Sequence, residues 1–188
     1  MKLDSDSDIL RSEKFFLKPF TLKDIQKEYI GWLNDTVVNQ YLEIRFEKQT
    51  LKTAEAYINS FNNRKDKFLW GIYSLDNKKL IGTTSLYDMN AHHGLIHTSI
   101  MIGNKNYWGT SATMETKTIV INYAFSKLKV RKVLAGTYAV NMSMNFTLKK
   151  LGFEIEGKLI QNRLLKNGKY CDELKWGLLK NEWKKKFN

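Results

Sequence analysis

The segment from Met101 to Glu115 constrains this chain most, because an apolar run passes through a glycine-containing turn directly into an amphipathic helix pattern. Glycine at position 109 lets a ligand approach the main chain without a Cβ in the way, and Thr110 or Ser111 can cap the helix that follows. The first turn of a helix leaves backbone N–H groups without intrahelical partners, and such groups bind phosphates. The segment therefore fits an anion-binding turn, and it fits an ordinary capped helix start equally well.

Hydrophobic periodicity predicts a mixed sheet with several helices. Apolar and β-branched runs predict strands at residues 15–20, 67–75, 79–87, 95–103, 132–140, 154–165 and 170–179. Helix patterns with cap residues predict helices at residues 21–32, 51–63, 112–129 and 142–151, and a further short helix ending at Leu42. The helix at 112–129 lies between two predicted strands, which favours a βαβ unit with parallel strands at the centre of the sheet.

Composition limits the class of protein. With 188 residues, 43% of them hydrophobic, the chain suits one folded domain over residues 1–188, and no linker composition or repeat divides it. No long apolar run is present, and the first residues lack the apolar core of a secretory signal, so we expect no membrane partner. The single cysteine, Cys171, provides neither a disulfide framework nor a metal cluster. We therefore expect a soluble cytoplasmic protein without a metal, either monomeric or homodimeric.

The charge balance is strongly basic. The formal net charge is +12, from 31 Lys and Arg against 19 Asp and Glu. This excess favours phosphate-bearing ligands and disfavours polycationic ones, although a solvated surface that includes the run Lys184 to Lys186 explains much of it as well. No motif of a nucleic-acid-binding fold accompanies the charge, so we expect no nucleic-acid partner.

Four segments of the chain resemble a single enzyme family. They are YIGWLNDTVVNQYLEIR, GNKNYWGTSATME, NMSMNFTLKKLGFEIEG and EGKLIQNRLLKNGKYCDELKWGLL, and together they extend over nearly the whole chain. The sequence resembles the GNAT superfamily of acetyl-CoA-dependent N-acetyltransferases, in the branch that includes the ribosomal-protein-alanine acetyltransferases. The resemblance implies a mixed α+β fold, with a central, mostly antiparallel mixed sheet of about seven strands and helices on both faces.

The resemblance also implies an acetyl-CoA site. In the family the turn reads Gln or Arg, two residues, Gly, one residue, then Gly or Ala, whereas this chain has Asn106, Gly109 and Ser111 at those places. Trp108 either shapes this turn or packs the helix onto the sheet, and Asn141 meets the pantetheine arm, caps its helix, or does both. The implied cofactor-binding residues are Met101, Ile102, Gly103, Asn106, Trp108, Gly109, Thr110, Ser111, Ala112, Thr113, Asn141, Asn145 and Lys149.

Acetyl transfer to an amine needs a proton acceptor and stabilisation of the negative charge that develops on the thioester oxygen. The resemblance implies that a backbone amide near Met101 polarises the thioester carbonyl. Many relatives have Tyr where this chain has Leu148, and branch members often have Ser where it has Met144, so we expect water to protonate the leaving thiolate. The candidate bases are Asp88, Glu43 and His97.

The acceptor is expected to be a small molecule with a primary amine that attacks directly in a ternary complex. Resemblance to members found with surface-polysaccharide biosynthesis favours the amine of a nucleotide-linked amino sugar, and a basic chain tolerates its diphosphate. A protein N-terminus is the rival acceptor, a polyamine is disfavoured by the charge, and a noncatalytic acyl-CoA-binding module is the alternative of another class. By position in the resemblance, the acceptor-binding residues are Trp32, Asn34, Glu43 and Arg45.

Overall fold

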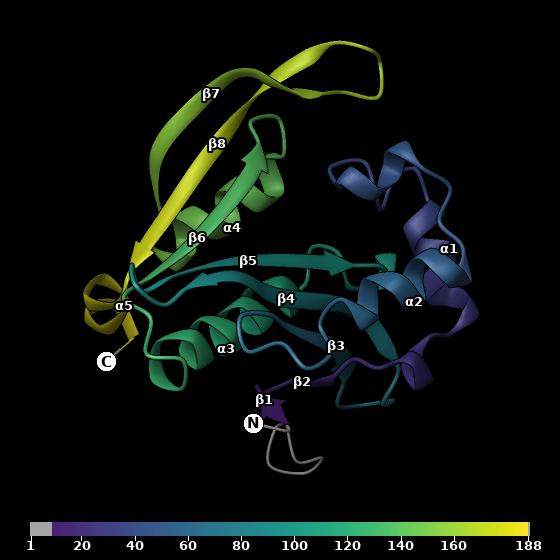
Figure 1. Ribbon diagram of the computed structural model, residues 1–188, viewed down its shortest axis with the longest axis horizontal. Helices are drawn as coiled ribbons and strands as arrows, with labels where there is room; N and C mark the ends of the chain where they lie inside the picture. The colour runs from purple at the N-terminus through teal and green to yellow at the C-terminus, as the bar shows by residue number, and fades with distance from the viewer. Residues whose placement is uncertain (1–8, 188) are drawn as a thin grey trace. The chain divides into compact units, whose positions relative to one another are not determined.

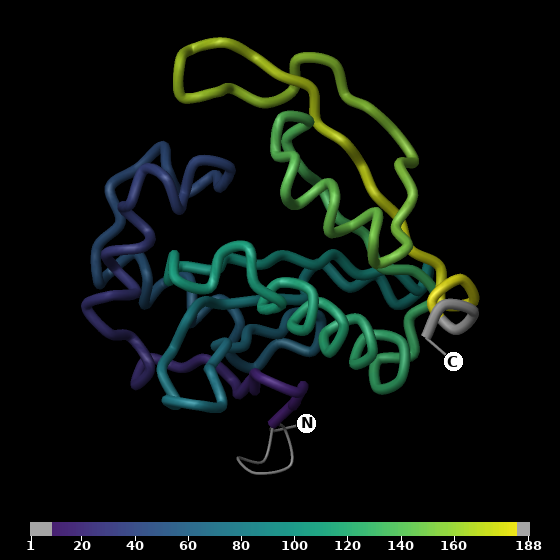
Figure 2. Tube along the Cα trace, turned by 180° about the vertical axis from the view of Figure 1, so that it is seen from behind, coloured from purple at the N-terminus to yellow at the C-terminus, as the bar shows by residue number. Residues whose placement is uncertain are grey.

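The computed structural model describes residues 9–187 as a mixed α+β fold with an eight-stranded sheet in the order β1-β2-β3-β4-β5-β6-β8-β7 (Figures 1 and 2). The strands are β1 Leu10–Arg11, β2 Phe15–Pro19, β3 Phe68–Ser74, β4 Leu80–Asn90, β5 Leu95–Ile102, β6 Lys132–Tyr138, β7 Glu154–Leu164 and β8 Tyr170–Leu179. The α-helices are α1 Lys27–Asn34, α2 Leu51–Asn59, α3 Ala112–Ser126, α4 Met142–Leu151 and α5 Lys180–Phe187. The 3-10 helices are η1 Leu22–Asp24, η2 Glu43–Phe46 and η3 Lys105–Tyr107. None of the described helices is both long enough and apolar enough to cross a membrane.

The chain forms two compact units. Among the described residues, the first comprises 9–87 and 99–120, and the second comprises 88–98 and 121–187. Strands β4 and β5 and helix α3 each pass from one unit into the other, so neither unit is a single continuous stretch of chain. The single domain expected over residues 1–188 stays a prediction.

In the first unit, strand β3 is buried on both faces, which requires packing elements on both sides. Helices α1 and α2 supply one layer, because Tyr29 and Leu33, and likewise Ala54 and Ile58, are four residues apart and face the same hydrophobic cluster. The first half of α3 covers the opposite face of this part of the sheet (Figures 1 and 2). The expected helices on both faces are therefore present.

In the second unit, β5 and β6 run parallel, with Leu95 opposite Lys132, and they confirm the predicted βαβ unit around α3. Strand β6 pairs antiparallel with β8, and β8 pairs antiparallel with β7 in the predicted hairpin. Helix α4 has the predicted bounds. The side chain of Asn141 caps its start, and Gly152, at φ +96°, ends it in the left-handed conformation that glycine adopts most easily.

The region between residues 21 and 42 was predicted as two helices, and only the later part of the first one is helical, as α1. Thr21 instead opens the short η1, because the carboxylate of Asp24 accepts from the backbone N–H and the hydroxyl of Thr21 and closes a single turn. Helix α1 starts later, at Lys27, and the residues that follow it form turns up to η2. Asp35 stabilises the first of these turns by accepting from the N–H groups of Val37 and Val38.

Two elements were not predicted at all. Strand β1 has only two residues, which is too short for a detectable alternation, and it raises the strand count from the expected seven to eight. Helix α5 starts at Lys180 within a highly charged sequence that contains few apolar residues. Both elements depend on contacts with the rest of the fold rather than on a local signal.

Candidate active site

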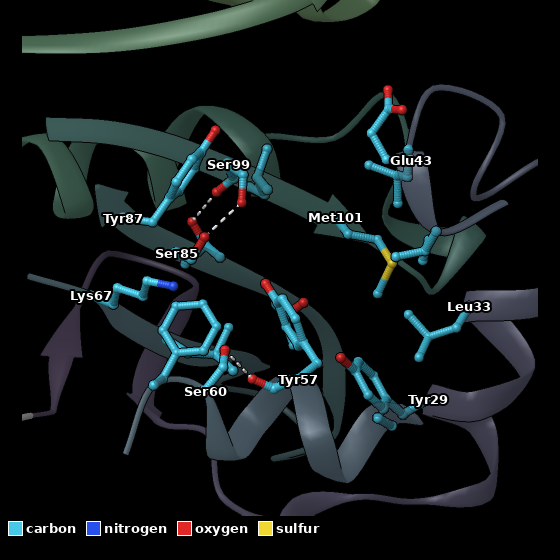
Figure 3. A pocket seen from close by; sticks show the side chains of 18 of the residues that line it. Tyr29, Leu33, Glu43, Tyr57, Ser60, Lys67, Ser85, Tyr87, Ser99 and Met101 are labelled. Carbon is cyan, nitrogen blue, oxygen red and sulfur yellow. Dashed lines mark hydrogen bonds between the residues drawn. The ribbon is translucent and has the colours of Figure 1, made fainter. Parts of the chain in front are cut away.

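The first unit contains a cavity of about 390 Å³ that has the composition of a small-molecule pocket (Figure 3). Its walls come from α1, η2, α2, β4 and β5, so segments far apart in the sequence form it together. Hydroxyl groups dominate its polar lining, contributed by Tyr29, Tyr57, Ser60, Ser85, Tyr87 and Ser99. The cavity therefore offers many neutral hydrogen-bonding groups and few charges.

Strands β4 and β5 hold several of these hydroxyls in fixed positions. The hydroxyl oxygens of Ser85 and Ser99 lie 2.7 Å apart in a hydrogen bond (Figure 3). The hydroxyl of Thr84 donates to the backbone oxygen of Ser99 at 2.7 Å. Because these groups sit on adjacent strands rather than on loops, this wall of the cavity is rigid.

The two tyrosines from the helices remain protonated over the whole physiological range. Burial raises the pKa of the Tyr57 hydroxyl to about 12, and the neighbouring Tyr87 adds to this effect while a hydrogen bond with Ser85 opposes it. The outer part of Tyr57 is exposed, but its hydroxyl points into the cavity (Figure 3). Burial likewise raises the pKa of Tyr29. Both hydroxyls can therefore donate hydrogen bonds to a bound molecule.

The three candidate bases do not share one unit. Glu43 lines the cavity of the first unit from η2. Asp88 and His97 lie in the second unit, where burial lowers the pKa of His97, Asp88 opposes that change and Lys175 adds to it. His97 is therefore close enough to Asp88 for an electrostatic interaction and is held in its neutral form, which is the form that accepts a proton.

Three of the four expected acceptor-binding residues have structural contacts and do not line the cavity. Trp32 packs so closely over Gly103 that a Cβ there would overlap the indole ring. The Asn34 side chain donates to the backbone oxygens of Ile30 and Gln49 and accepts from the N–H of Gln49, which ties α1 to the segment before α2. The guanidinium of Arg45 lies 4.5 Å from the centre of the Phe46 ring. A role of these residues in binding stays a prediction.

The glycine-containing turn between β5 and α3 is held by its own side chains. The indole N–H of Trp108 donates to the backbone oxygen of Ile102 at 2.8 Å, although 41% of the Trp108 surface is exposed. The side chain of Asn104 accepts from the N–H of Asn106 at 3.1 Å. The Thr110 hydroxyl donates to the backbone oxygen of Tyr107 at 2.7 Å and accepts from the N–H of Ala112. Trp108 and Thr110 thus shape the turn rather than only the helix.

The turn before α3 leaves the main chain accessible to a ligand. Gly109 has φ +72°, and a Cβ at this position would meet open space, so the main chain is accessible there. The Ser111 hydroxyl donates to the carboxylate of Glu115 at 2.6 Å, and this carboxylate also accepts from the N–H of Lys14. Ser111 therefore donates its hydroxyl to Glu115 and the N–H of Ala112 donates to Thr110, while the first-turn amide of Thr113 is the type of group that binds phosphate.

In the second unit, the three expected cofactor residues of α4 have different environments. Asn141 accepts from the N–H of Met144 at 3.2 Å, which is the helix-capping role. Asn145 donates to the backbone oxygens of Tyr138 and Ala139 and accepts from the Thr137 hydroxyl at 2.5 Å. Its amide therefore joins α4 to the end of β6.

Lys149 is exposed on α4, as expected for a solvated helix face. Leu148, in the position of the Tyr of many relatives, is 1% exposed and belongs to the core. The helix thus offers an exposed ammonium group and no side-chain acid at position 148.

Sequence reasoning missed most of the cavity. Thr83, Thr84, Ser85 and Tyr87 all line the cavity from β4, and this run of hydroxyl residues in the buried part of a strand is a signal that could have identified them. Tyr57 lies within the predicted helix at residues 51–63, and Lys67 is the first residue of the predicted strand at 67–75. Their shared location follows from the packing of α2 against β3 and β4, which no local pattern reveals.

Comparisons with known proteins agree with this architecture. The family model described as acetyltransferase (GNAT) domain matches residues 14–154. The uncharacterized N-acetyltransferase YoaA of Bacillus subtilis is 27% identical over 176 residues, which cover 92% of this chain and 97% of that protein. The ribosomal protein uS5-alanine N-acetyltransferase of Escherichia coli is 27% identical over 129 residues, which cover 67% of this chain and 64% of that protein.

Solved structures share the fold at lower sequence identity. The GNAT-family acetyltransferase from Bacillus anthracis has a TM-score of 0.77 and 17% identity, with 92% of this chain and 99% of that chain covered. The spermidine N-acetyltransferase from Vibrio cholerae, solved with CoA and spermine, has a TM-score of 0.81 and 19% identity, with 92% and 99% covered.

Proposed function

The chain belongs to the GNAT acetyltransferase family and is an acetyl-CoA-dependent N-acetyltransferase, and we propose that its acceptor is the amine of a nucleotide-linked amino sugar bound in the cavity of the first unit. Most of the exposed surface of that cavity is apolar, and the hydroxyls that make up most of its polar groups carry this proposal. Sugars present hydroxyl groups that both donate and accept, and Ser and Tyr side chains do the same. A polyamine would instead need several carboxylates, and the described lining contains only Glu43.

The residues proposed to hold acetyl-CoA are the turn around Gly109 and the start of α3, for the pyrophosphate, and Asn141, for the pantetheine arm. The open main chain at Gly109 and the first-turn amides of a 15-residue helix support the first assignment. When bound, acetyl-CoA supplies a thioester: a bond forms between the amine nitrogen and the carbonyl carbon, the C–S bond breaks, and the sulfur leaves as a thiolate. The backbone amide near Met101 is proposed to stabilise the developing charge on the carbonyl oxygen.

We assign the removal of the amine proton to Glu43, with His97 and its neighbour Asp88 as the second candidate. Glu43 is the only carboxylate among the described residues that line the cavity, which makes it the first candidate, although it is exposed and its carboxylate points away from Met101 in Figure 3. His97 is suited by chemistry, because its neutral form is favoured by burial. Water protonates the thiolate, since Leu148 is buried where many relatives have a tyrosine.

The amine of a protein N-terminus is the second candidate acceptor. It is favoured by the 27% identity with the uS5-alanine N-acetyltransferase of Escherichia coli. A peptide would have to extend beyond a cavity of about 390 Å³ and present only its first residues to the lining hydroxyls. Binding of the amino sugar therefore depends on the hydroxyl groups of the sugar, whereas binding of a protein N-terminus depends on the first residues of a peptide.

A thiol-release assay with acetyl-CoA and three acceptor panels tests the proposal. The panels contain UDP-linked amino sugars, N-terminal peptides and polyamines. Turnover is expected with the UDP-linked sugars, and turnover confined to peptides would reject the sugar. Thermal shift with acetyl-CoA, run beside the assay, reports cofactor binding independently. Stabilisation by acetyl-CoA without turnover of any acceptor would favour the noncatalytic binding module.

The base is tested by Glu43→Gln and His97→Gln across a range of pH. Glu47 is exposed, lies just beyond the same 3-10 helix and does not line the cavity, so Glu47→Gln is the matched control for Glu43→Gln. Glu43→Gln is expected to lower kcat and change the pH profile, while Glu47→Gln leaves both unchanged. A normal profile for Glu43→Gln together with an altered one for His97→Gln would transfer the role to His97.

A further inference from the structure

The two charged groups of the cavity lie apart from each other. Among the described lining residues, Glu43 is the only carboxylate and Lys67 is the only cation. Figure 3 shows them on opposite sides of the cavity, with Leu33 and Met101 on the side of Glu43 and Tyr87 and Ser60 on the side of Lys67. The cavity is thus electrostatically polar, with a negative end and a positive end.

Lys67 is held so that its charge faces inward. It directly precedes β3 and is half-buried, and its ammonium points toward the interior of the cavity in Figure 3. The ammonium nitrogen lies 5.9 Å from the centre of the Phe61 ring, which also lines the cavity. This aromatic contact favours the cation and restricts the flexible side chain.

The neighbouring carboxylate does not compete strongly for Lys67. Asp66 is engaged by Arg64, whose guanidinium donates to both carboxylate oxygens at 2.7 and 2.6 Å. Such a two-bond pair is geometrically matched and uses the favoured acceptor positions of Asp66. Lys67 contributes least among the groups that lower the pKa of Asp66, and the hydrogen bond from Arg64 contributes most, so the charge of Lys67 can also act on a bound anion.

The negative end of the cavity is next to the strand that is assigned to the thioester. Leu42 and Ile44, on either side of Glu43, pack against the hydrophobic cluster that contains Met101. An amine that reacts near Met101 would therefore lie on the side of Glu43. The remainder of an acceptor bound along the cavity would extend toward Lys67.

We propose that Lys67 binds a phosphate group of the acceptor and so selects molecules with an amine at one end and a phosphate toward the other. This inference rests on the proposed function, because it takes the same cavity as the acceptor site. Lys67 then determines specificity and not chemistry: it lowers KM for phosphorylated acceptors and repels a second cation such as that of a polyamine. Lys67 would bind the phosphate of a sugar phosphate and the first phosphate of a nucleotide-linked sugar in the same way.

Lys67→Met and Lys67→Glu test the proposal, with Lys65→Glu as the matched control because Lys65 is exposed and does not line the cavity. The probes are glucosamine phosphate, glucosamine and spermidine. Lys67→Met is expected to raise KM for glucosamine phosphate about tenfold, with kcat and the KM for glucosamine unchanged. Lys67→Glu is expected to raise it further and to lower KM for spermidine. Lys65→Glu should behave as the wild type.

Binding without turnover keeps this inference separate from the proposed function. Glucosamine phosphate should raise Tm of the wild type more than glucosamine does, and Lys67→Met should abolish that difference. The inference is overturned if the phosphate preference, in KM or in Tm, survives in Lys67→Met, or if both acceptors weaken equally, as a purely structural role would produce. A third outcome is that Lys67→Met loses the larger rise in Tm with glucosamine phosphate while the wild type releases thiol with none of the amines. That outcome would support the phosphate site at Lys67 and reject the proposed acceptor.

Discussion

Replacing Lys117 with methionine should stabilise the protein, and most strongly near neutral pH. Lys117 lies on α3 and is only 2% exposed, and burial lowers the pKa of its ammonium from 10.5 to about 7. Between these two values the unfolded chain binds the proton more tightly than the folded chain, so protonation favours unfolding. The free energy of unfolding therefore rises with pH in this window, from about 7 toward 10.5.

The size of the effect follows from the two pKa values. A change of one pKa unit corresponds to about 1.4 kcal/mol, so the burial of Lys117 costs the folded state about 4 kcal/mol at pH 7 and about 2 kcal/mol at pH 9. Methionine has a similar length and no charge to desolvate. Any difference in packing between the two side chains adds an amount that does not depend on pH.

Urea denaturation of the wild type and Lys117→Met at several pH values measures this difference directly. All other titrating groups are common to both proteins, so the difference between their free energies of unfolding isolates Lys117. We expect this difference to shrink by about 2 kcal/mol between pH 7 and pH 9. Lys127 is exposed just after α3, so Lys127→Met is the surface control for the same substitution. The reasoning is refuted if the Lys117→Met difference is constant with pH.

Three further changes test individual contacts. Asn145→Ala removes three hydrogen bonds between α4 and the end of β6. It should lower the free energy of unfolding by about 2 kcal/mol in urea denaturation. An effect below about 0.5 kcal/mol would show that the Asn145 amide does not stabilise the fold. Gly103→Ala should displace Trp32, lower Tm and change the near-ultraviolet circular dichroism, and an unchanged spectrum would contradict the close packing of the two residues. Burial lowers the pKa of His97 below 6.5, so the unfolded chain binds more protons on the acid side and the wild type loses stability as pH falls through 6.5. His97→Gln should remove this part of the pH dependence of the free energy of unfolding. Equal acid profiles of the wild type and His97→Gln would count against this reasoning.

Elements with a local signal were predicted well, and those without one were not. Helix α4 has the predicted bounds, because its cap at Asn141 and its stop at Gly152 are formed by residues next to the helix itself. The segment from residue 21 was misread because Thr21 caps any helical turn, while the length of that turn depends on Asp24, which also accepts from Lys18 and the distant Tyr73. The local sequence pattern shows the cap at Thr21, but it does not show that Tyr73 binds Asp24.

The candidate site shows the same division. Glu43 was identified by resemblance and lines the cavity, but Lys67, Tyr57 and Tyr87 were not singled out, since each is unremarkable in its own segment. Asn145 was expected to bind the cofactor, and the structure gives its amide three partners on β6 and the residue after it. Sequence spacing along a helix indicates which residues share a face, but not what that face contacts.

The sequence by itself determined the glycine-containing turn before α3, the βαβ unit, the capped helix α4 and the family, because each depends on neighbouring residues or on a motif read in order. Only the tertiary structure decided which side chains form the cavity, where its two charges lie and which predicted residues are already occupied by structural contacts. The physical reason is that burial and hydrogen-bond partners are set by elements distant in the chain. Lys67 becomes a candidate anion site only when α2, β3 and β4 pack together around it.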